Sequence, residues 1–350
     1  MDQPNSEVDY DLLRSRFQSF SEKECRGSSV LYERIAAEVA QDQGLLELAS
    51  HAQPRQPVPN MLFAAVHYLL LAGADGELGR FYRSIAGDAV ASESPYPAFK
   101  EFCDLHRSEI IELLGSRRVQ TNEVRRCTYL YPVFCEVYRR TQKPLAVFEI
   151  GTAAGLQLMW DHYSYEYDGD GVVFGAQGSA VHLRAEIRGS HRPSVSRLPP
   201  PVVWRAGADI KIVDLADEDE ALWLRALVWP EHSDRLESMA VAVDVIRAKQ
   251  PRLIEGDGTQ MVEDACREAP DDAMLCVFHT HVANQLQPHA KHELLETLSR
   301  AAEHRPLAHI YNNMMDGLLH LDMLGVADPS SEAVAETDGH ARWFEWLPKE

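Results

Sequence analysis

A run of small residues follows an apolar, strand-like segment in residues 147–155, VFEIGTAAG. Small side chains at Gly151, Thr152, Ala153 and Gly155 let a ligand approach the backbone, and the glycines allow the sharp turn that such an approach needs. A helix expected after the turn would present unpaired N–H groups to that ligand. The pattern therefore predicts a binding site for a nucleotide-like molecule.

The acidic residue Glu149 narrows the class of ligand. A dinucleotide fingerprint has a second glycine two positions after the first, whereas this chain has Ala153 there and its next glycine at Gly155. A carboxylate two residues before Gly151 suits a ligand with an ammonium group and repels a pyrophosphate. These features disfavour NAD and favour S-adenosylmethionine. The alternative is a tight strand-to-helix turn without a ligand.

Two further acidic residues follow predicted strands. The run at 181–187 ends near Glu186, where a Rossmann sheet binds a ribose. The separation from the glycine turn exceeds the usual ~20 residues, so we expect residues 161–180 to form an insertion over the site. Asp257, between two glycines after another apolar run, can accept a hydrogen bond from an adenine amino group. The alternatives are a surface glutamate and a turn aspartate that caps the next helix.

Two histidines end the expected strand at 273–281. In an extended segment His279 and His281 point to the same side, and an imidazole that titrates near neutrality can remove a proton from a methyl acceptor. We therefore take both as candidate catalytic residues, with His279 as the preferred base. A pair of metal ligands and a purely structural role are the alternatives.

Polar and aromatic residues on either side of the glycine turn suit a small organic acceptor. Gln120, Asn122 and Glu123 offer amide and carboxylate groups, and Trp160 and Tyr163 offer aromatic rings. Ligand pockets combine such groups, so we expect these residues to bind the substrate. The alternative for the first three is a capped helix N-terminus with a solvated face.

The elements that must position these residues form two regions. A chain of 350 residues exceeds the usual single domain of about 100–200 residues. Residues 8–140 have apolar positions at three- and four-residue spacing, which predicts five or six helices. Beyond Lys143, helical stretches alternate with expected strands, which lie at 145–151, 181–187, 251–256, 273–281, 307–313 and 341–347. We therefore expect an all-α N-terminal domain at 1–142, acting as a substrate cap, and a Rossmann-like α/β domain at 143–350.

Composition excludes several partners. The formal net charge of −20 opposes nucleic-acid binding, which depends on cations at phosphates. The first residues lack a signal-peptide pattern, and the longest apolar run, at 61–73, is too short to cross a bilayer. The six cysteines show neither a CxxC pair nor metal-ligand spacing. We expect a cytoplasmic protein with a small-molecule substrate and no metal, membrane or nucleic-acid partner; its oligomeric state stays open.

The chain also resembles an uncharacterised bacterial family whose core is similar to class I S-adenosylmethionine-dependent methyltransferases. The resemblance is carried by QTNE at 120–123, EIGTAAGLQL at 149–158, DHYSYEY at 161–167, RAGAD at 205–209 and LVWPEHSDR at 227–235. It implies a class I methyltransferase-like fold with S-adenosylmethionine as cofactor, and it implies that QTNE and DHY lie near the pocket.

The sequence therefore predicts a methyltransferase that uses S-adenosylmethionine for O- or N-methylation of a metabolite or natural product. One alternative is a catalytically silent protein that binds a nucleoside or metabolite with the same fold, since fold alone does not fix function. Another is a metal-dependent enzyme that uses the two histidines and a carboxylate.

Overall fold

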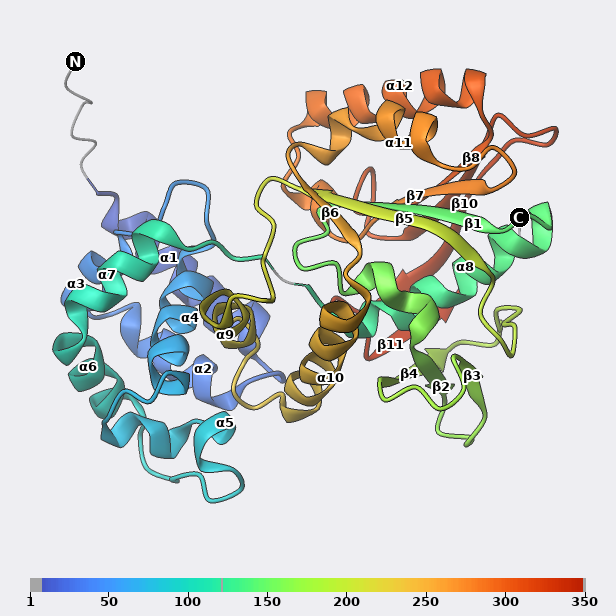
Figure 1. Cartoon of the computed structure of the whole chain (residues 1–350). Coiled ribbons are helices and arrows are strands. Elements are labelled where there is room, and N and C mark those ends of the chain that lie inside the picture. The colour runs from blue at the N-terminus through green and yellow to red at the C-terminus, as the bar shows by residue number, and fades with distance from the viewer. Residues whose placement is uncertain (1–7, 121, 349–350) are drawn as a thin grey trace, which may run out of the picture. The chain divides into compact units, whose positions relative to one another are not determined.

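The computed structural model describes residues 8–120 and 122–348. They form a mixed α/β protein with a large, mostly parallel sheet of 11 strands (Figure 1). The chain divides into two compact units. The first comprises the described residues of Met1–Thr121 together with Asp217–Leu236, and the second comprises Asn122–Ala216 and Glu237–Glu350 as far as they are described.

Within the described residues, the first unit is built from helices and turns. Several helices begin at a side chain that accepts a backbone N–H: Asp9 accepts from Leu12 at 2.9 Å, and Ser29 accepts from Tyr32 at 3.0 Å. Buried aromatic residues such as Phe63 form its core. Its helices are α1 (Tyr10–Ser19), α2 (Val30–Val39), α3 (Gln43–Ala49), α4 (Val58–Leu71), α5 (Arg83–Ala86), α6 (Tyr96–Leu105), α7 (Arg107–Ser116) and α9 (Glu218–Ala226), with the short helices η1 (Phe20–Cys25) and η2 (Glu77–Phe81).

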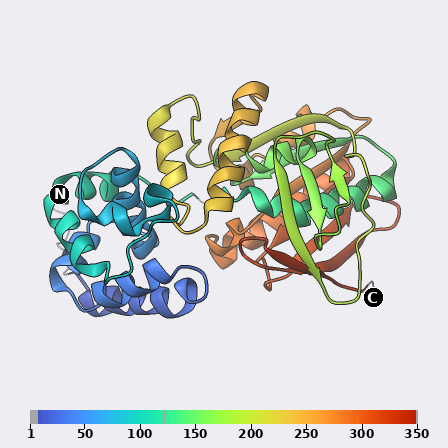
Figure 2. The same cartoon turned by 90° about the horizontal axis from the view of Figure 1, so that it is seen from below.

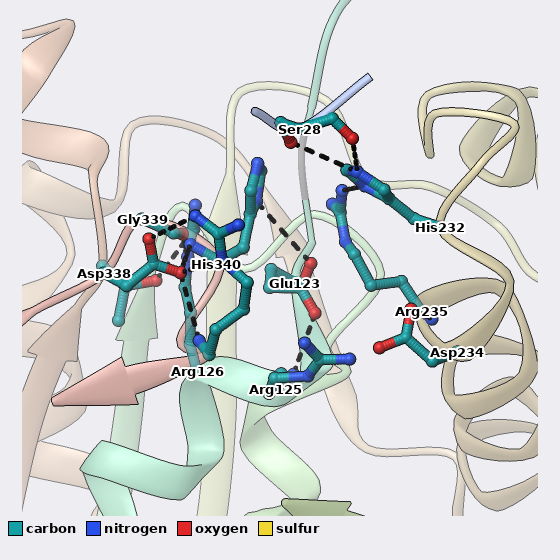
Figure 3. Close-up of polar contacts among 12 residues, drawn as sticks. Ser28, Glu123, Arg125, Arg126, His232, Asp234, Arg235, Asp338, Gly339 and His340 are labelled. Atoms are coloured by element: carbon teal, nitrogen blue, oxygen red, sulfur yellow. Dashed lines mark hydrogen bonds and ion pairs between the residues drawn. The ribbon is translucent and has the colours of Figure 1, made fainter. Parts of the chain in front are cut away.

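The segment Asp217–Leu236 joins this unit through side chains of the LVWPEHSDR motif. Trp229 belongs to the buried helical core. Glu231 accepts a hydrogen bond from a backbone amide at the start of α2. The Nε2 atom of His232 lies 3.0 Å from the backbone oxygen of Ser28 (Figure 3). This motif therefore anchors a late segment of the chain to the N-terminal helices.

The second unit contains the sheet. Its strands are β1 (Leu145–Ile150), β2 (Ser164–Tyr167), β3 (Val173–Gly175), β4 (His182–Arg188), β5 (Val202–Asp209), β6 (Arg252–Glu255), β7 (Met274–His279), β8 (Leu307–Asn312), β9 (Leu319–Leu324), β10 (Ser330–Thr337) and β11 (Trp343–Trp346). Their spatial order is β3-β2-β4-β11-β10-β9-β8-β7-β1-β5-β6. Neighbours from β8 to β6 are parallel, whereas β9 and β10 run antiparallel to the strands beside them in an up-and-down meander. The strands β3, β2 and β4 lie at one end of this order, and in the view of Figure 2 they lie in front, in yellow-green.

Helices cover both faces of this sheet (Figure 1). Alternate residues of the central strands, such as Phe148 and Val277, share a core with Leu294 of α12 (Pro288–His304) and with α11 (Val262–Glu268). On the other face, Phe134 of α8 (Cys127–Thr141) stacks on Trp160, with ring centroids 4.3 Å apart. The remaining helices are α10 (Ser233–Lys249), which begins in the first unit, and η3 (Val124–Arg126), η4 (Gln157–His162), η5 (Gly258–Gln260) and η6 (Val282–Asn284).

The strands expected from the sequence are all present, but three other expectations need correction. The division of the chain does not follow 142/143, because α8 packs on the sheet and 217–236 packs with the helices. No α-helix follows the glycine turn; the short 3₁₀-helix η4 does. Residues 161–180 contribute β2 and β3 to the sheet instead of forming a separate cover over the site. No helix in the described ranges is long and apolar enough to span a membrane.

Candidate ligand-binding site

The carboxyl end of β1 lies where the chain order of the sheet reverses. All six residues of β1 are buried, and Glu149 pairs with Gly207 of β5 on one side and Phe278 of β7 on the other. In open α/β sheets, ligands bind outside the carboxyl ends of the strands at such a reversal. The residues after β1, β5 and β7 therefore define the candidate site.

The turn after β1 contains three residues in the left-handed backbone region. The φ angles are +75° at Gly151, +49° at Ala153 and +78° at Gly155. A Cβ on Gly151 would overlap the side chain of Val282, and one on Gly155 would lie 2.9 Å from Cδ2 of Leu253. The glycines are therefore required by the turn and by protein packing, and protein side chains already fill the spaces that we expected to face a ligand.

Glu149 has a carboxyl group that is buried without a cationic partner. It is 2% exposed, and its Oε2 accepts a hydrogen bond from Oγ1 of Thr152 at 2.6 Å. No ion pair to it occurs within the described chain. Burial raises the pKa of Glu149 well above its usual value, and the negative charge of Asp209 raises it further, while Thr152 and Arg126 act in the opposite direction. The carboxyl group thus favours its neutral form until a cation approaches.

Asn122 connects the two ends of the glycine turn. Its Nδ2 donates to the backbone oxygen of Thr152 at 3.2 Å, and its Oδ1 accepts from the backbone amide of Leu156 at 2.9 Å. The neighbouring backbone oxygen of Glu123 accepts from Nε2 of Gln157 at 3.2 Å. The structure therefore places Asn122 and Glu123 at the turn, where Asn122 fixes its shape.

Two more sequence motifs meet at the same turn. Arg205 of RAGAD binds Asp161 of DHY through two hydrogen bonds of 2.7 and 2.8 Å. Asp209, the last residue of β5, accepts from the backbone amide of Ala153 at 2.9 Å. A Cβ on Gly207 would overlap Thr152, so glycine in β5 makes room for the Thr152 side chain. These contacts explain why short segments far apart in sequence form one local structure.

The carboxyl end of β7 supplies polar groups on the side of α8. Nη1 of Arg126 donates to Oγ1 of Thr280 at 3.3 Å, and Oγ1 of Thr280 donates to Oε1 of Gln157 at 3.0 Å. Nε of Arg126 donates to the backbone oxygen of Gly339 at 3.3 Å (Figure 3). Burial and the charges of Arg126 and His340 lower the pKa of His281 to about 3, which keeps its ring neutral.

The two candidate catalytic histidines separate in the structure. His279 is fully buried, and its Nε2 lies 3.2 Å from Nε2 of His309, whose Nδ1 faces Asp322 at 3.8 Å. His281 has a left-handed φ of +60°, and its Nδ1 lies 3.4 Å from Nδ2 of Asn313. The backbone leaves the extended form at His281, so the two rings do not share a side as the alternation of strand residues suggested.

Metal ligation by these histidines also lacks support in the geometry. No group of three or more His, Cys, Asp or Glu side chains in the described residues has an arrangement that would hold a metal ion. Sequence reasoning missed His309 and Asp322, which lie opposite each other on β8 and β9, with His309 in contact with His279 of β7. In the sequence, the only signal for His309 and Asp322 was the alternation of polar and apolar residues in the short strands β8 and β9.

Glu186 and Asp257 do not have the surroundings expected of them. Five strands separate β4 from β1, and Glu186 is exposed beside a surface hollow of about 280 Å³. The carboxylate at the strand end next to the glycine turn is that of Asp209, not that of Glu186. Asp257 follows β6 and is exposed, where its Oδ1 accepts from the backbone amide of Thr259 at 3.0 Å. This contact matches the capping alternative for Asp257.

The aromatic residues expected to line the acceptor pocket belong to the core. Trp160 and Tyr163 are both fully buried. The hydroxyl of Tyr163 donates to the backbone oxygen of Leu156 at 2.7 Å, which ties η4 to the residues that follow it. Gln120 is half-buried and belongs to the first unit. Thr121, within the same QTNE motif, lies outside the described residues.

The comparisons with known proteins identify a family and no further relative. No curated protein matches the chain, and no solved structure matches it. A family model described as an uncharacterized protein conserved in bacteria (DUF2332) matches residues 14–346. Since this match spans nearly the whole sequence, the chain belongs to that bacterial family.

Proposed function

We propose that this protein binds S-adenosylmethionine at the carboxyl ends of β1, β5 and β7 and methylates a small organic acceptor. The observation that carries the proposal is Asp209, a carboxylate at the end of the strand beside the glycine turn. Five parallel strands lie side by side in the order β6, β5, β1, β7 and β8. Numbered by their position along the chain, these five are the third, second, first, fourth and fifth. Doubly wound nucleotide-binding sheets have the same order, and an acidic residue at the end of their second strand binds the ribose.

The residues at the site fit the charge pattern of this cofactor. Asp209 would accept hydrogen bonds from the ribose hydroxyls. Asp257 at the next strand end would contact the adenine amino group only in addition to capping at Thr259, from which its Oδ1 accepts two hydrogen bonds. Glu149 is a buried carboxyl group that accepts a hydrogen bond from Thr152 of the turn, and an ammonium group above Thr152 would favour its ionised form. Bound there, S-adenosylmethionine would supply an electrophilic methyl group.

His281 replaces His279 as the preferred base. Methyl transfer depends mainly on positioning, with at most one base to accept a proton from an oxygen or nitrogen of the acceptor. The ring of His279 is enclosed under α12 and engaged by His309. His281 is partly exposed and follows the carboxyl end of β7. To act as the base, the neutral imidazole would accept the proton at Nδ1, in place of its contact with Nδ2 of Asn313 at 3.4 Å.

A catalytically silent binding protein is the second candidate. Val282 and Leu253 occupy the space beside Gly151 and Gly155, so the turn has a structural role even without a ligand. This observation favours a protein that keeps the fold and binds a metabolite elsewhere on the sheet edge. Cofactor binding at Asp209 separates the two candidates.

The test is calorimetric titration of the full chain with S-adenosylmethionine and S-adenosylhomocysteine, with NADH as a control. We expect micromolar binding of the first two and none of NADH. Asp209→Asn should weaken binding about tenfold, since a hydrogen bond to a charged group contributes about 1.5–3 kcal/mol. Glu186→Gln is the matched control and should bind as the unmodified protein does. Absence of binding, or equal losses in both variants, would overturn the proposal.

A further inference from the structure

Three buried polar groups without a hydrogen-bonding partner lie near Arg126, within the second unit. They are the hydroxyl of Tyr129, Nδ2 of Asn312 and Nε2 of His281, and none of them makes a hydrogen bond of good geometry within the described residues. Tyr129 and Asn312 are fully buried. Leaving such groups unpaired costs about 1–3 kcal/mol each, so this concentration of them needs a reason.

Their positions are linked by contacts between the elements that carry them. The backbone amide of His281 donates to Oδ1 of Asn312 at 2.7 Å, which leaves Nδ2 at the other end of the amide group. Tyr129 lies three residues after Arg126 at the start of α8, and Nη1 of Arg126 donates to Oγ1 of Thr280, the residue before His281. The groups therefore gather where the start of α8 meets the carboxyl ends of β7 and β8.

All three groups can donate a hydrogen bond. Nδ2 of Asn313 lies 3.4 Å from Nδ1 of His281, and an amide NH₂ is a donor only. Nδ1 is therefore the acceptor of the neutral ring, which assigns the ring proton to Nε2. Asn312 Nδ2 is a donor by its chemistry, and the phenol of Tyr129 donates to any acceptor. The cationic Arg126 adds positive charge beside these donors.

We propose that Arg126, Tyr129, His281 and Asn312 form a subsite for a carboxylate group. A carboxylate only accepts hydrogen bonds, and its charge is stabilised by buried donors and a guanidinium group. The backbone of His281 supports a ligand site here, because its φ of +60° is uncommon for a residue with a Cβ and such positions concentrate at binding sites. As a site for the methyl acceptor, the subsite depends on the proposed function; as a carboxylate site, it does not.

The subsite can be tested without the cofactor. Protein labelled with ¹³C at histidine Cε1 is titrated with acetate and, separately, with acetamide, while the His281 resonance, assigned with His281→Gln, is followed by NMR. We expect a saturable shift with acetate and none with acetamide. No saturation with acetate, or equal effects of both probes, would overturn the proposal.

Two phenylalanine variants on α8 separate a ligand role from a structural one. Tyr129→Phe removes the unpaired hydroxyl, so it should weaken acetate binding about tenfold and leave thermal stability unchanged or higher. Tyr131→Phe is the control, because that hydroxyl donates to the backbone oxygen of Ser196 at 2.9 Å. It should lower thermal stability and leave acetate binding unchanged. A destabilised Tyr129→Phe with unchanged acetate binding would mean that the hydroxyl is structural.

The outcomes for the subsite and the cofactor are independent. Acetate binding without S-adenosylmethionine binding would retain the subsite and remove the methyltransferase proposal. Binding of S-adenosylmethionine without acetate binding would retain the function and remove the subsite.

Discussion

Asp209 accepts a hydrogen bond from the backbone amide of Ala153, a non-glycine residue with a left-handed φ of +49°. The carboxylate stabilises a backbone conformation that disfavours a Cβ. Position 153 is also where dinucleotide-binding turns have their second glycine. The backbone at position 153 therefore has a left-handed conformation that glycine would adopt more easily, although the residue is alanine.

Substituting Ala153 with glycine should stabilise the protein. The left-handed conformation costs a residue with a Cβ about 1–2 kcal/mol. The extra entropy of glycine in the unfolded chain and the loss of the buried Ala153 methyl group offset part of that gain. We expect the free energy of unfolding to rise by about 0.5 kcal/mol in urea denaturation. The control Ala154→Gly removes a buried methyl group from a residue without positive φ and should destabilise. A loss of stability in Ala153→Gly would contradict the assignment of strain.

Substituting Asn122 with alanine should destabilise the turn. The change leaves the backbone oxygen of Thr152 and the backbone amide of Leu156 without their partner in a buried environment. Each unpaired buried group costs about 1–3 kcal/mol, so we expect a loss of about 2–4 kcal/mol in urea denaturation. The exposed Asn284 is the control, and its alanine variant should change stability by less than about 0.5 kcal/mol. Equal losses of stability in the two alanine variants would mean that the Asn122 side chain does not stabilise the turn.

The sequence analysis predicted the glycine turn after β1 but did not identify Asp209, the carboxylate that lies beside this turn. Strand, glycine and small residues are local signals, so β1 and its turn were predictable. The strand β5 begins directly after Pro199–Pro201, and a run of prolines is typical of an extended connector, so this region does not read as a strand. The acidic strand end was therefore assigned to Glu186 instead of Asp209. The run VVWRAGAD, with β-branched residues and a terminal aspartate, was the missed signal.

Other differences arise from packing that no local pattern contains. The polar character of Asn122 was evident, but its role depends on two backbone groups about thirty residues away. Trp160 and Tyr163 had the chemistry of a pocket wall, yet α8 covers them as part of a core. His279 and His281 alternate correctly for a strand, and only the left-handed backbone at His281 separates them.

Glu149 should make stability depend on pH. Its folded pKa is raised, so the folded state binds a proton more tightly than the unfolded state does, and stability falls as pH rises above the usual value of 4.5. Glu149→Gln keeps an acceptor for Thr152 and has no such proton. We therefore expect the stability of Glu149→Gln relative to the unmodified protein to increase from pH 5 to pH 8 in urea denaturation. A pH-independent difference would show that Glu149 is not neutralised by burial.

His279 should matter for stability and not for cofactor binding. His279 lies two residues after Val277 in β7, so the two side chains are on the same face of the sheet. Val277 shares a core with α12, so this is the face that α12 covers. His279→Phe removes the partner of His309 Nε2 and should cost about 1–3 kcal/mol of folding free energy. Calorimetry should find the affinity for S-adenosylmethionine unchanged. His309→Phe is the matched control and should lose a comparable amount, because it removes the same contact and leaves Asp322 without its imidazole. Loss of cofactor binding in a folded His279→Phe variant would instead return His279 to the site.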